Sequence, residues 1–281
     1  MINEAVNRVS DTKLFASFDN NKKKQIMIYS NEIDNKYPSN AMVLPVPNPK
    51  SVKFHSMKEC SDFFSQLDKN FVEVNAMLGA RSKSYNFSDS LNDVKQSLQI
   101  HDVGSYLVSI VESYADFDRL DKSVFRLTDG IKDILKTKYS ATFGFLVCKL
   151  KVGTRQYEPL AYSHNSLTKH SRPYLFVPTY HYHPHGSFGG LNSYYNNHTD
   201  DNTYADDWSH DIYIINLNPS SDFNSYIKKL DSFGSWVYQK NPNTRVGYNK
   251  LNFDLPNNLQ NYQKLHVEGR RINTDLVVDV Y

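Results

Sequence analysis

Short apolar runs and alternating apolar and polar residues fill much of the chain, and this pattern is typical of β-strands. Residues 12–18 and 25–29 are two such runs, and the polar stretch between them has lysine at positions 22–24. Two strand-like runs joined by a short polar segment predict a β-hairpin. The lysines indicate a solvated hairpin tip rather than a binding patch.

Further strands are predicted where β-branched and aromatic residues cluster. Segment 142–150 is an almost continuous apolar run, which is typical of a central strand. Segment 41–49 is also apolar, but Pro45, Pro47 and Pro49 cannot donate backbone hydrogen bonds, so we expect it at a sheet edge or in an extended connection. The remaining predicted strands are residues 105–111, 174–180, 210–215 and 275–281.

Three segments carry apolar residues at helical spacing instead. Residues 56–71 predict a helix that covers a sheet face, Thr128 is the predicted N-cap of a second helix, and residues 222–238 predict a third. The apolar stripes behind these predictions are Phe63, Phe64, Leu67 and Phe71; Ile131, Ile134 and Leu135; and Phe223, Tyr226, Ile227, Leu230, Phe233 and Trp236.

Many strands with a few helices predict an α+β fold that is mainly β, with antiparallel or mixed sheets and a few covering helices. The chain of 281 residues suits a single β-rich domain over residues 1–281. Residues 80–92 are rich in Ser and Asn, which indicates a surface loop and a soft subdomain boundary near residues 80–100.

The composition is that of a folded protein: 40% of the residues are hydrophobic, the mean hydropathy is −0.58, and 20 Tyr and 16 Phe need burial or a partner. Lys and Arg number 32 against 30 Asp and Glu, which gives a formal charge of +2. Without a broad basic field there is little counterion release to drive binding, so nucleic acid is not favoured as a partner.

Cysteine use and the chain's apolar runs bear on its location. The only 2 cysteines, Cys60 and Cys148, lie far apart, which suggests neither a disulfide framework nor a zinc finger. We find no signal peptide in the first residues and no run of about 20 apolar residues that would span a bilayer. These features predict an intracellular protein, cytoplasmic or within a particle, without membrane insertion.

The most distinctive segment is residues 180–186, because it holds three of the chain's 10 histidines at alternate positions. If the strand predicted from residue 174 continues through this segment, His181 and His183 lie on one face. Two imidazoles on one face can hold a metal ion, and imidazole nitrogen suits Zn, Cu, Fe or Ni. The sequence therefore predicts a site for zinc or another transition metal.

Further ligands are expected from the next predicted strand if it pairs with the first. His210 is the candidate third imidazole, and Asp207 the candidate carboxylate. The side chains of Asp206, Asp211 and His185 are candidates for orienting these ligands. The alternative is that the histidines are ordinary surface residues of a Tyr- and His-rich hairpin.

Two functions follow from these patterns. Abundant Tyr, Phe and Asn favour broad contacts with protein, so we expect a structural or interaction (assembly) protein whose partner is a second copy of itself or another protein, giving an oligomer. The alternative is a metal-dependent hydrolase, in which a metal-bound water attacks and Asp207 or Asp211 acts as base. The sequence has no HExxH, GxSxG, GxxxxGK[ST] or GxGxxG motif. Cys148 lies in an apolar run and is expected to be an inert core thiol.

Several of these segments together resemble uncharacterised proteins of large DNA viruses and protists. The resemblance rests on residues 12–15, on residues 41–47, on residues 176–179 with His181 and His183, and on residues 207–213. It implies a viral or protist protein and no particular activity.

Overall fold

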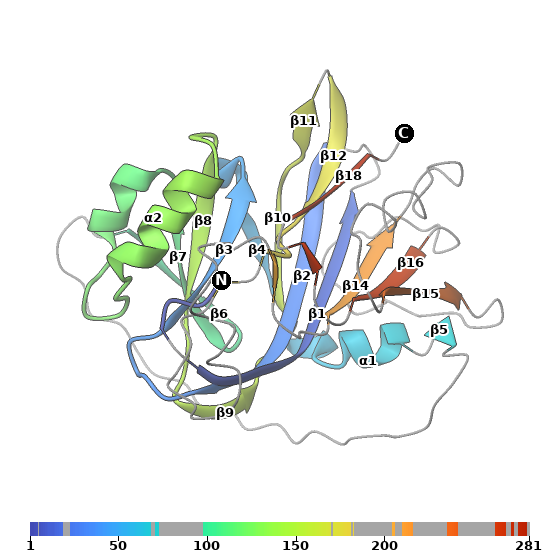
Figure 1. Ribbon diagram of the computed structural model, residues 1–281, viewed down its shortest axis with the longest axis horizontal. Coiled ribbons are helices and arrows are strands. Elements are labelled where there is room, and N and C mark those ends of the chain that lie inside the picture. The colour runs from blue at the N-terminus through green and yellow to red at the C-terminus, as the bar shows by residue number, and fades with distance from the viewer. Residues whose placement is uncertain are drawn as a thin grey trace.

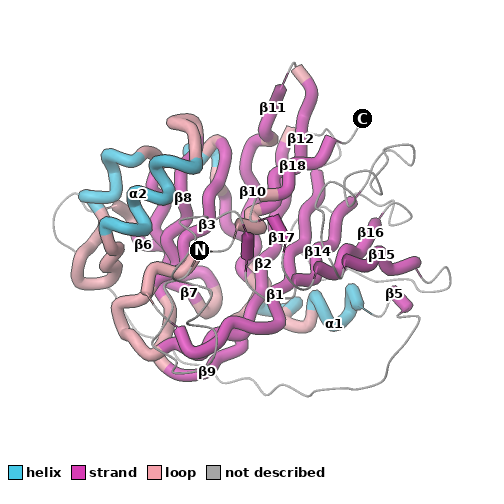
Figure 2. The backbone as a smooth tube through the Cα atoms, in the orientation of Figure 1, coloured by secondary structure: helices cyan, strands magenta, loops and turns pink. Residues whose placement is uncertain are grey.

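The computed structural model describes residues 1–4, 6–18, 23–68, 71–72, 98–169, 171–180, 182, 204–205, 210–215, 235–240, 262–267, 271–272 and 275–279. Within these ranges the protein is an α+β fold that is mainly β, as predicted (Figure 1). Figure 2 shows few helical segments, placed outside the strands.

The larger sheet has nine strands among the residues described. The predicted hairpin is confirmed and is longer than expected: β1 and β2 pair in antiparallel from Phe18 back to Val6, with register shifts between Val6 and Arg8 and between Ser10 and Lys13. The sheet is mixed, since β1 pairs in parallel with β14 while its other pairings are antiparallel. Its order is β4 (Lys53–His55), β10 (Leu160–Asn165), β2 (Lys24–Asn35), β1 (Val6–Phe18), β14 (His210–Ile215), β16 (Tyr262–Val267), β15 (Ser235–Lys240) and β5 (Phe71–Val72), and β9 (Gly153–Gln156) also pairs with β2.

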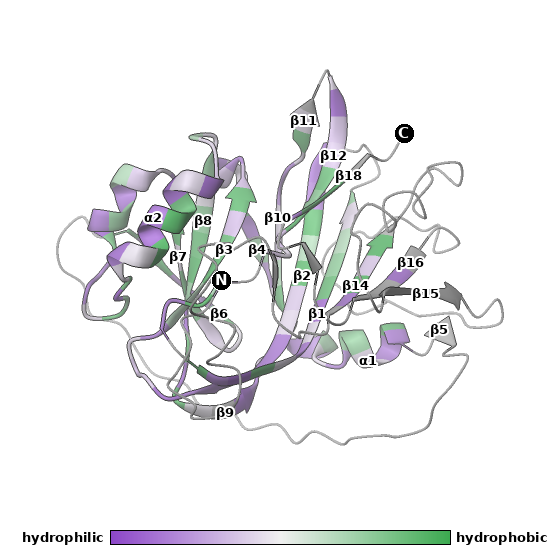
Figure 3. Cartoon of the chain, viewed as in Figure 1, coloured by the Kyte–Doolittle hydropathy of each residue, from purple (hydrophilic) through white to green (hydrophobic). Residues whose placement is uncertain are grey.

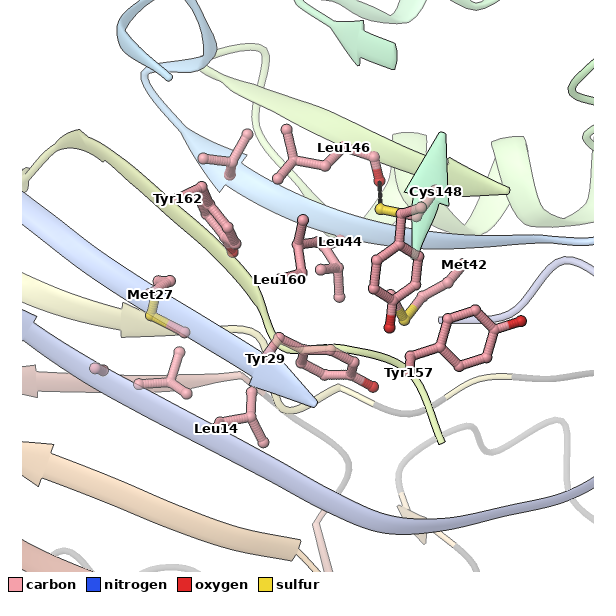
Figure 4. Close-up of a cluster of buried hydrophobic side chains, with 14 of the residues drawn as sticks. Leu14, Met27, Tyr29, Met42, Leu44, Leu146, Cys148, Tyr157, Leu160 and Tyr162 are labelled. Carbon is pink, nitrogen blue, oxygen red and sulfur yellow. Dashed lines mark hydrogen bonds between the residues drawn. The ribbon is translucent and has the colours of Figure 1, made fainter. Parts of the chain in front are cut away.

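A second, antiparallel sheet packs against the first. Its order is β3 (Ala41–Pro47), β8 (Phe143–Lys149), β7 (Tyr106–Val111) and β6 (Ile100–Val103). The central position of β8 and the edge position of the proline-containing β3 are both confirmed. Between the sheets, the side chains of Leu14, Met27, Leu44, Leu146 and Leu160 form one buried cluster (Figure 4).

Alternation along the strands gives each sheet a second apolar face, which a helix covers. Val43 and Val147 point away from the shared core and pack with Ile131 and Leu135 of α2 (Asp129–Lys138). On the far face of the nine-stranded sheet, Phe15 packs against α1 (Phe63–Asp68), with ring centroids of Phe15 and Phe63 5.2 Å apart. The result is a helix–sheet–sheet–helix arrangement, with hydrophobic residues recurring along the strands of both sheets (Figure 3).

Smaller elements complete the fold. Three strands form a separate sheet in the order β11 (Leu167–Lys169), β12 (Arg172–Val177) and β18 (Leu276–Asp279). The strand pair β13 (Tyr204–Ala205) and β17 (Arg271–Ile272) is also present. Short 3-10 helices lie at η1 (Pro49–Ser51), η2 (Lys58–Cys60) and η3 (Tyr114–Arg119).

One buried glutamine ties the small sheet to the large one. Gln25, in β2, is fully buried, and its Oε1 accepts a hydrogen bond of 2.8 Å from the backbone N–H of Phe176 in β12. Its Nε2 donates to the carbonyl oxygen of the same residue. The amide side chain thus satisfies both backbone groups of Phe176, as a neighbouring strand would.

The helix predictions are partly confirmed. Thr128 caps α2 as predicted, since its Oγ1 accepts a hydrogen bond from the N–H of Ile131. The helix expected over 56–71 is shorter, covering Phe63–Asp68, and Phe71 belongs to β5 instead. The prediction of helix over 222–238 is wrong for residues 235–238, which lie in β15, while residues 222–234 lie outside the described residues.

The predicted single domain stays a prediction, as does the soft boundary near 80–100. Residues 80–97 lie outside the described residues, and so does the predicted loop at 80–92.

Candidate functional site

Most of the predicted metal ligands cannot be placed. His181, His183, His185, Asp206 and Asp207 lie outside the described residues. His210 is the first residue of β14, where its strand partners are Thr12 of β1 and Val267 of β16. Within the described ranges, no group of three or more His, Cys, Asp or Glu side chains could hold a metal ion.

Two assumptions behind the predicted site are wrong. β12 ends at Val177, and the N–H of Thr179 turns back to the carbonyl of Val177 at 2.9 Å, so the strand does not run on through residues 178–180. β14 does not pair with β12: it pairs with β1 and β16, while β12 pairs with β11 and β18. Strand pairing depends on contacts between distant segments, which local pattern does not specify.

A small cavity nevertheless brings the two predicted regions toward each other. It has a volume of about 20 Å³, which is room for about one water molecule. Tyr180 and Tyr182, which flank His181 in sequence, line it together with Thr12, the strand partner of His210. The backbone N–H of Ile2 holds this segment in place by donating to the carbonyl of Tyr182 at 2.7 Å.

Asp211 belongs to a network of charges on the α1 side of the large sheet. Its Oδ2 lies 3.0 Å from Nζ of Lys264, and the same ammonium lies 2.8 Å from Oδ1 of Asp68. Asp68 also pairs with Lys13 at 3.2 Å and accepts a hydrogen bond from the hydroxyl of Tyr213. Lys13 stands opposite Asp211 in the register of β1 and β14, so sheet geometry and α1 together assemble the network.

The electrostatics of this network favour ion pairs. Burial lowers the pKa of Lys13, but Asp68 and Asp11 outweigh burial, so this pKa is raised overall. Burial is also the main cause that raises the pKa of Tyr213, with Asp68 adding to it. An ammonium with a raised pKa stays protonated, so the network suits a structural role at the junction of α1 and the sheet.

The half-buried carboxylate of Asp275 joins three parts of the chain. Oδ2 of Asp275 accepts a hydrogen bond of 2.6 Å from the Tyr139 hydroxyl at the end of α2. Its Oδ1 accepts one of 2.9 Å from the N–H of Tyr180, and Asp275 directly precedes β18. Burial raises the pKa of Asp275, while these hydrogen bonds and Lys138 lower it. Asp275 therefore fixes the start of β18 and the segment that leads to His181.

Cys60 and Cys148 form no disulfide bond with each other. Cys148 is fully buried in β8, and burial raises the pKa of its thiol, which agrees with the predicted inert core thiol. Cys60 is half-buried in η2.

Among the helices in the described part of the chain, none is long and apolar enough to cross a membrane.

Apart from the edge predicted for residues 41–49, the sequence analysis did not identify the edge strands of the sheets. An edge strand presents backbone N–H and C=O groups to other chains, and proteins protect such edges with charges, prolines or shortness. β3 carries Pro45 and Pro47, and residues 1–3 hydrogen-bond its edge around Met42. β4 carries Lys53, and β6 carries Asp102. β5 has only two residues.

β18 differs from these edge strands. Of the strands described, it pairs with β12 alone, and Val277 is 39% exposed (Figure 1). Its only charged residue is Asp279, at its last position. β18 therefore presents an apolar strand edge, and the prediction of a strand at 275–281 contained no signal for its edge position.

These features define a class of protein rather than a reaction. The class is that of mainly β proteins in which two sheets share one core, and this protein also has an apolar edge strand. No family model matches the chain. Among solved structures it is similar to baculovirus P35, a viral protein, with 13% identity, a TM-score of 0.47 and coverage of 97% of each chain.

Proposed function

We propose that this chain is an interaction (assembly) protein and that β18 is its contact with a second copy. The observation that carries the proposal is the edge strand itself, which has the exposed Val277 and no proline or internal charge. A strand of this kind can extend its sheet by pairing with another strand.

A second copy suits this edge because antiparallel pairing of a strand with itself is isologous. Each β18 would offer the same residues to the other, and a two-fold axis would pass through the pair. Val277 would then meet apolar side chains of the other copy. A strand of four residues buries little area, so the dimer is expected to be weak and to depend on concentration.

The first test is sedimentation velocity of the full chain over a wide range of concentrations. We expect a monomer at low concentration and a dimer at high concentration. Val277→Lys should raise the dissociation constant about tenfold or more, equivalent to about 1.4 kcal/mol, because it places an ammonium group at the contact. A monomer at every concentration would refute the proposal.

Leu107→Lys is the matched control. Leu107 is 37% exposed, close to the value for Val277, but it lies in β7, which is paired on both sides by β6 and β8. We expect this variant to dimerise as the unaltered chain does. Equal weakening by both variants would show that general surface hydrophobicity drives association, and the role of the β18 edge would be abandoned.

We further propose that His181, His183 and His210 bind zinc or another transition metal, with Asp207 as a fourth ligand. Support comes from the cavity, because Tyr180 and Tyr182 flank His181 and share that cavity with Thr12, the partner of His210. Elemental analysis of the untagged protein beside the His181→Ala/His183→Ala variant tests the site. Near-stoichiometric metal that the variant loses is the expected result, and metal-free protein would end the proposal.

The same analysis bears on the alternative function, a metal-dependent hydrolase. If the metal belongs to a hydrolase, the double variant should lose a metal-dependent activity while keeping its fold. If it belongs to assembly, the double variant should change the sedimentation behaviour or the stability instead.

A further inference from the structure

One corner of the large sheet collects basic side chains on a single face. β10 lies between β2 and β4 (Figure 1). Ser163 and Asn165 are two residues apart on β10. Lys24 stands opposite Asn165, and Lys53 stands opposite Ser163. Because opposite residues share a face and side chains alternate along a strand, both lysines lie on the same face as Ser163.

His55 lies within this basic corner. It is two residues after Lys53 on β4, and its Nε2 is 2.9 Å from the Oγ of Ser163. Ser163 is buried with 5% exposed, while His55 is half-buried and both lysines are exposed. The imidazole is thus held against a buried hydroxyl of β10, with Lys53 on the same strand as His55 and Lys24 on β2.

The electrostatics show that the two lysines act on this imidazole. Burial is the largest cause that lowers the pKa of His55, and the ammonium groups of Lys24 and then Lys53 lower it further. The ammonium groups of Lys24 and Lys53 therefore make the protonated form of His55 less favourable. An anion placed there would interact with both ammonium groups and would favour the protonated imidazole.

Hydrogen bonds to Asn165 fix the end of β10, the strand that lies between β2 and β4. Ser51 in η1 accepts a hydrogen bond of 2.8 Å from the N–H of Asn165, and the Asn48 side-chain amide donates to the carbonyl of Asn165 at 3.1 Å. These contacts hold the end of β10 in position. The lysines therefore extend from β2 and β4, the two strands that pair with this fixed strand.

We infer that Lys24, Lys53 and His55 form a binding site for a phosphate group. Lysine ammonium groups bind phosphate as point charges, and a protonated imidazole adds a hydrogen-bond donor. The site is local: it takes one anionic group and does not need the broad basic surface that nucleic-acid binding requires. It is also independent of the proposed self-association through β18.

The test is NMR titration of the histidines in the full chain, in inorganic phosphate and in chloride at equal ionic strength. The His55 signal is identified by its absence in His55→Gln. Saturating phosphate should raise the pKa of His55 by about 0.5 to 1, because an opposite charge nearby favours the protonated ring and solvent screens part of the effect.

Matched controls separate a site from a general salt effect. Lys53→Gln should remove at least half of the phosphate response. Lys50→Gln should leave it intact, since Lys50 is 83% exposed and pairs with Glu112 at 3.8 Å. His101, whose pKa is lowered by burial alone, should titrate identically in both anions.

Three results would overturn the inference: an unchanged pKa of His55, an equal change at His101, or a full response in Lys53→Gln. Repeating the titration with phosphoserine distinguishes two sources of the group. A response to both compounds supports a site for phosphorylated side chains, whereas a response to inorganic phosphate alone supports a site for the free anion.

Discussion

The contact between Gln25 and Phe176 allows a sharp test of how the small sheet is attached to the large one. Gln25 is fully buried and hydrogen-bonds both backbone groups of Phe176, which is itself 3% exposed. Gln25→Ala removes both partners. Each buried backbone group that loses its partner costs about 1–3 kcal/mol, so the expected loss of unfolding free energy is about 2–6 kcal/mol. This is a large part of the 5–15 kcal/mol typical of a folded domain.

Urea unfolding measures this loss. Gln25→Ala should lower the midpoint while leaving the slope of free energy against urea unchanged, since the surface exposed on unfolding stays nearly the same. Gln66→Ala is the matched control: Gln66 is in α1, and its Nε2 bonds Oδ2 of Asp62 at 2.6 Å at the surface. We expect that variant to stay within about 0.5 kcal/mol of the unaltered chain.

Gln25→Glu separates the hydrogen bonds from simple packing. The glutamate keeps an acceptor for the N–H of Phe176 but, when ionised, places a carboxylate beside the carbonyl of the same residue. Burial should raise the pKa of this glutamate, and its protonated form can again donate to the carbonyl. The urea midpoint of Gln25→Glu relative to the unaltered chain should therefore rise as pH falls. A loss below about 1 kcal/mol in Gln25→Ala, or no such rise in Gln25→Glu, would refute the reasoning.

Two further predictions concern buried ionisable groups. Burial lowers the pKa of His164 to about 4, against about 6.5 in the unfolded chain. The neutral imidazole therefore contributes about 3 kcal/mol to the free energy of unfolding above pH 6.5, and this contribution is lost as pH falls toward 4. Across this window the urea midpoint of His164→Gln should fall less steeply than that of the unaltered chain, and equal slopes would contradict the assignment. Burial raises the pKa of Asp275, so its contribution is present at low pH and is lost as pH rises through that pKa. At pH 7, the free energy of unfolding of Asp275→Asn should therefore lie within about 1 kcal/mol of that of the unaltered chain, because the Tyr139 hydroxyl can turn to accept from the new amide. Asp275→Ala should lose about 2 kcal/mol or more. Similar losses in both variants would argue against a cost of burying the charge.

Local features of the fold were predictable from the sequence. The apolar runs at residues 12–18 and 25–29 specified the first hairpin, because both faces of these strands are buried, one between the sheets and the other against α1. Thr128 formed the expected cap because a cap depends on only a few neighbouring residues. Features that depend on distant partners were not predictable. Residues 235–238 have helical spacing, but pairing with β16 places them in a strand.

The same distinction applies to the candidate sites. The pairing of β14 with β1 rather than with β12 could not be derived from the composition of either strand. Lys24, Lys53 and Ser163 are far apart in sequence, and only the register of three strands brings them to one corner. Asp275 has no surrounding motif, since its partners come from α2 and from residue 180. The histidine-rich segment at residues 180–186, by contrast, can be recognised from the sequence alone, because its residues are contiguous.

The parallel pair of β1 and β14 has a consequence for synthesis of the chain. Residues 12–16 pair with residues 210–214, so one side of β1 has no strand partner until most of the chain has left the ribosome. Pairings between segments this far apart form slowly, because the intervening chain must first be closed into a loop. During that interval the β1–β2 hairpin presents an open strand edge to other nascent chains. Fragments that end before residue 210 should therefore aggregate, and the fold is expected to depend on chaperone protection until β14 emerges.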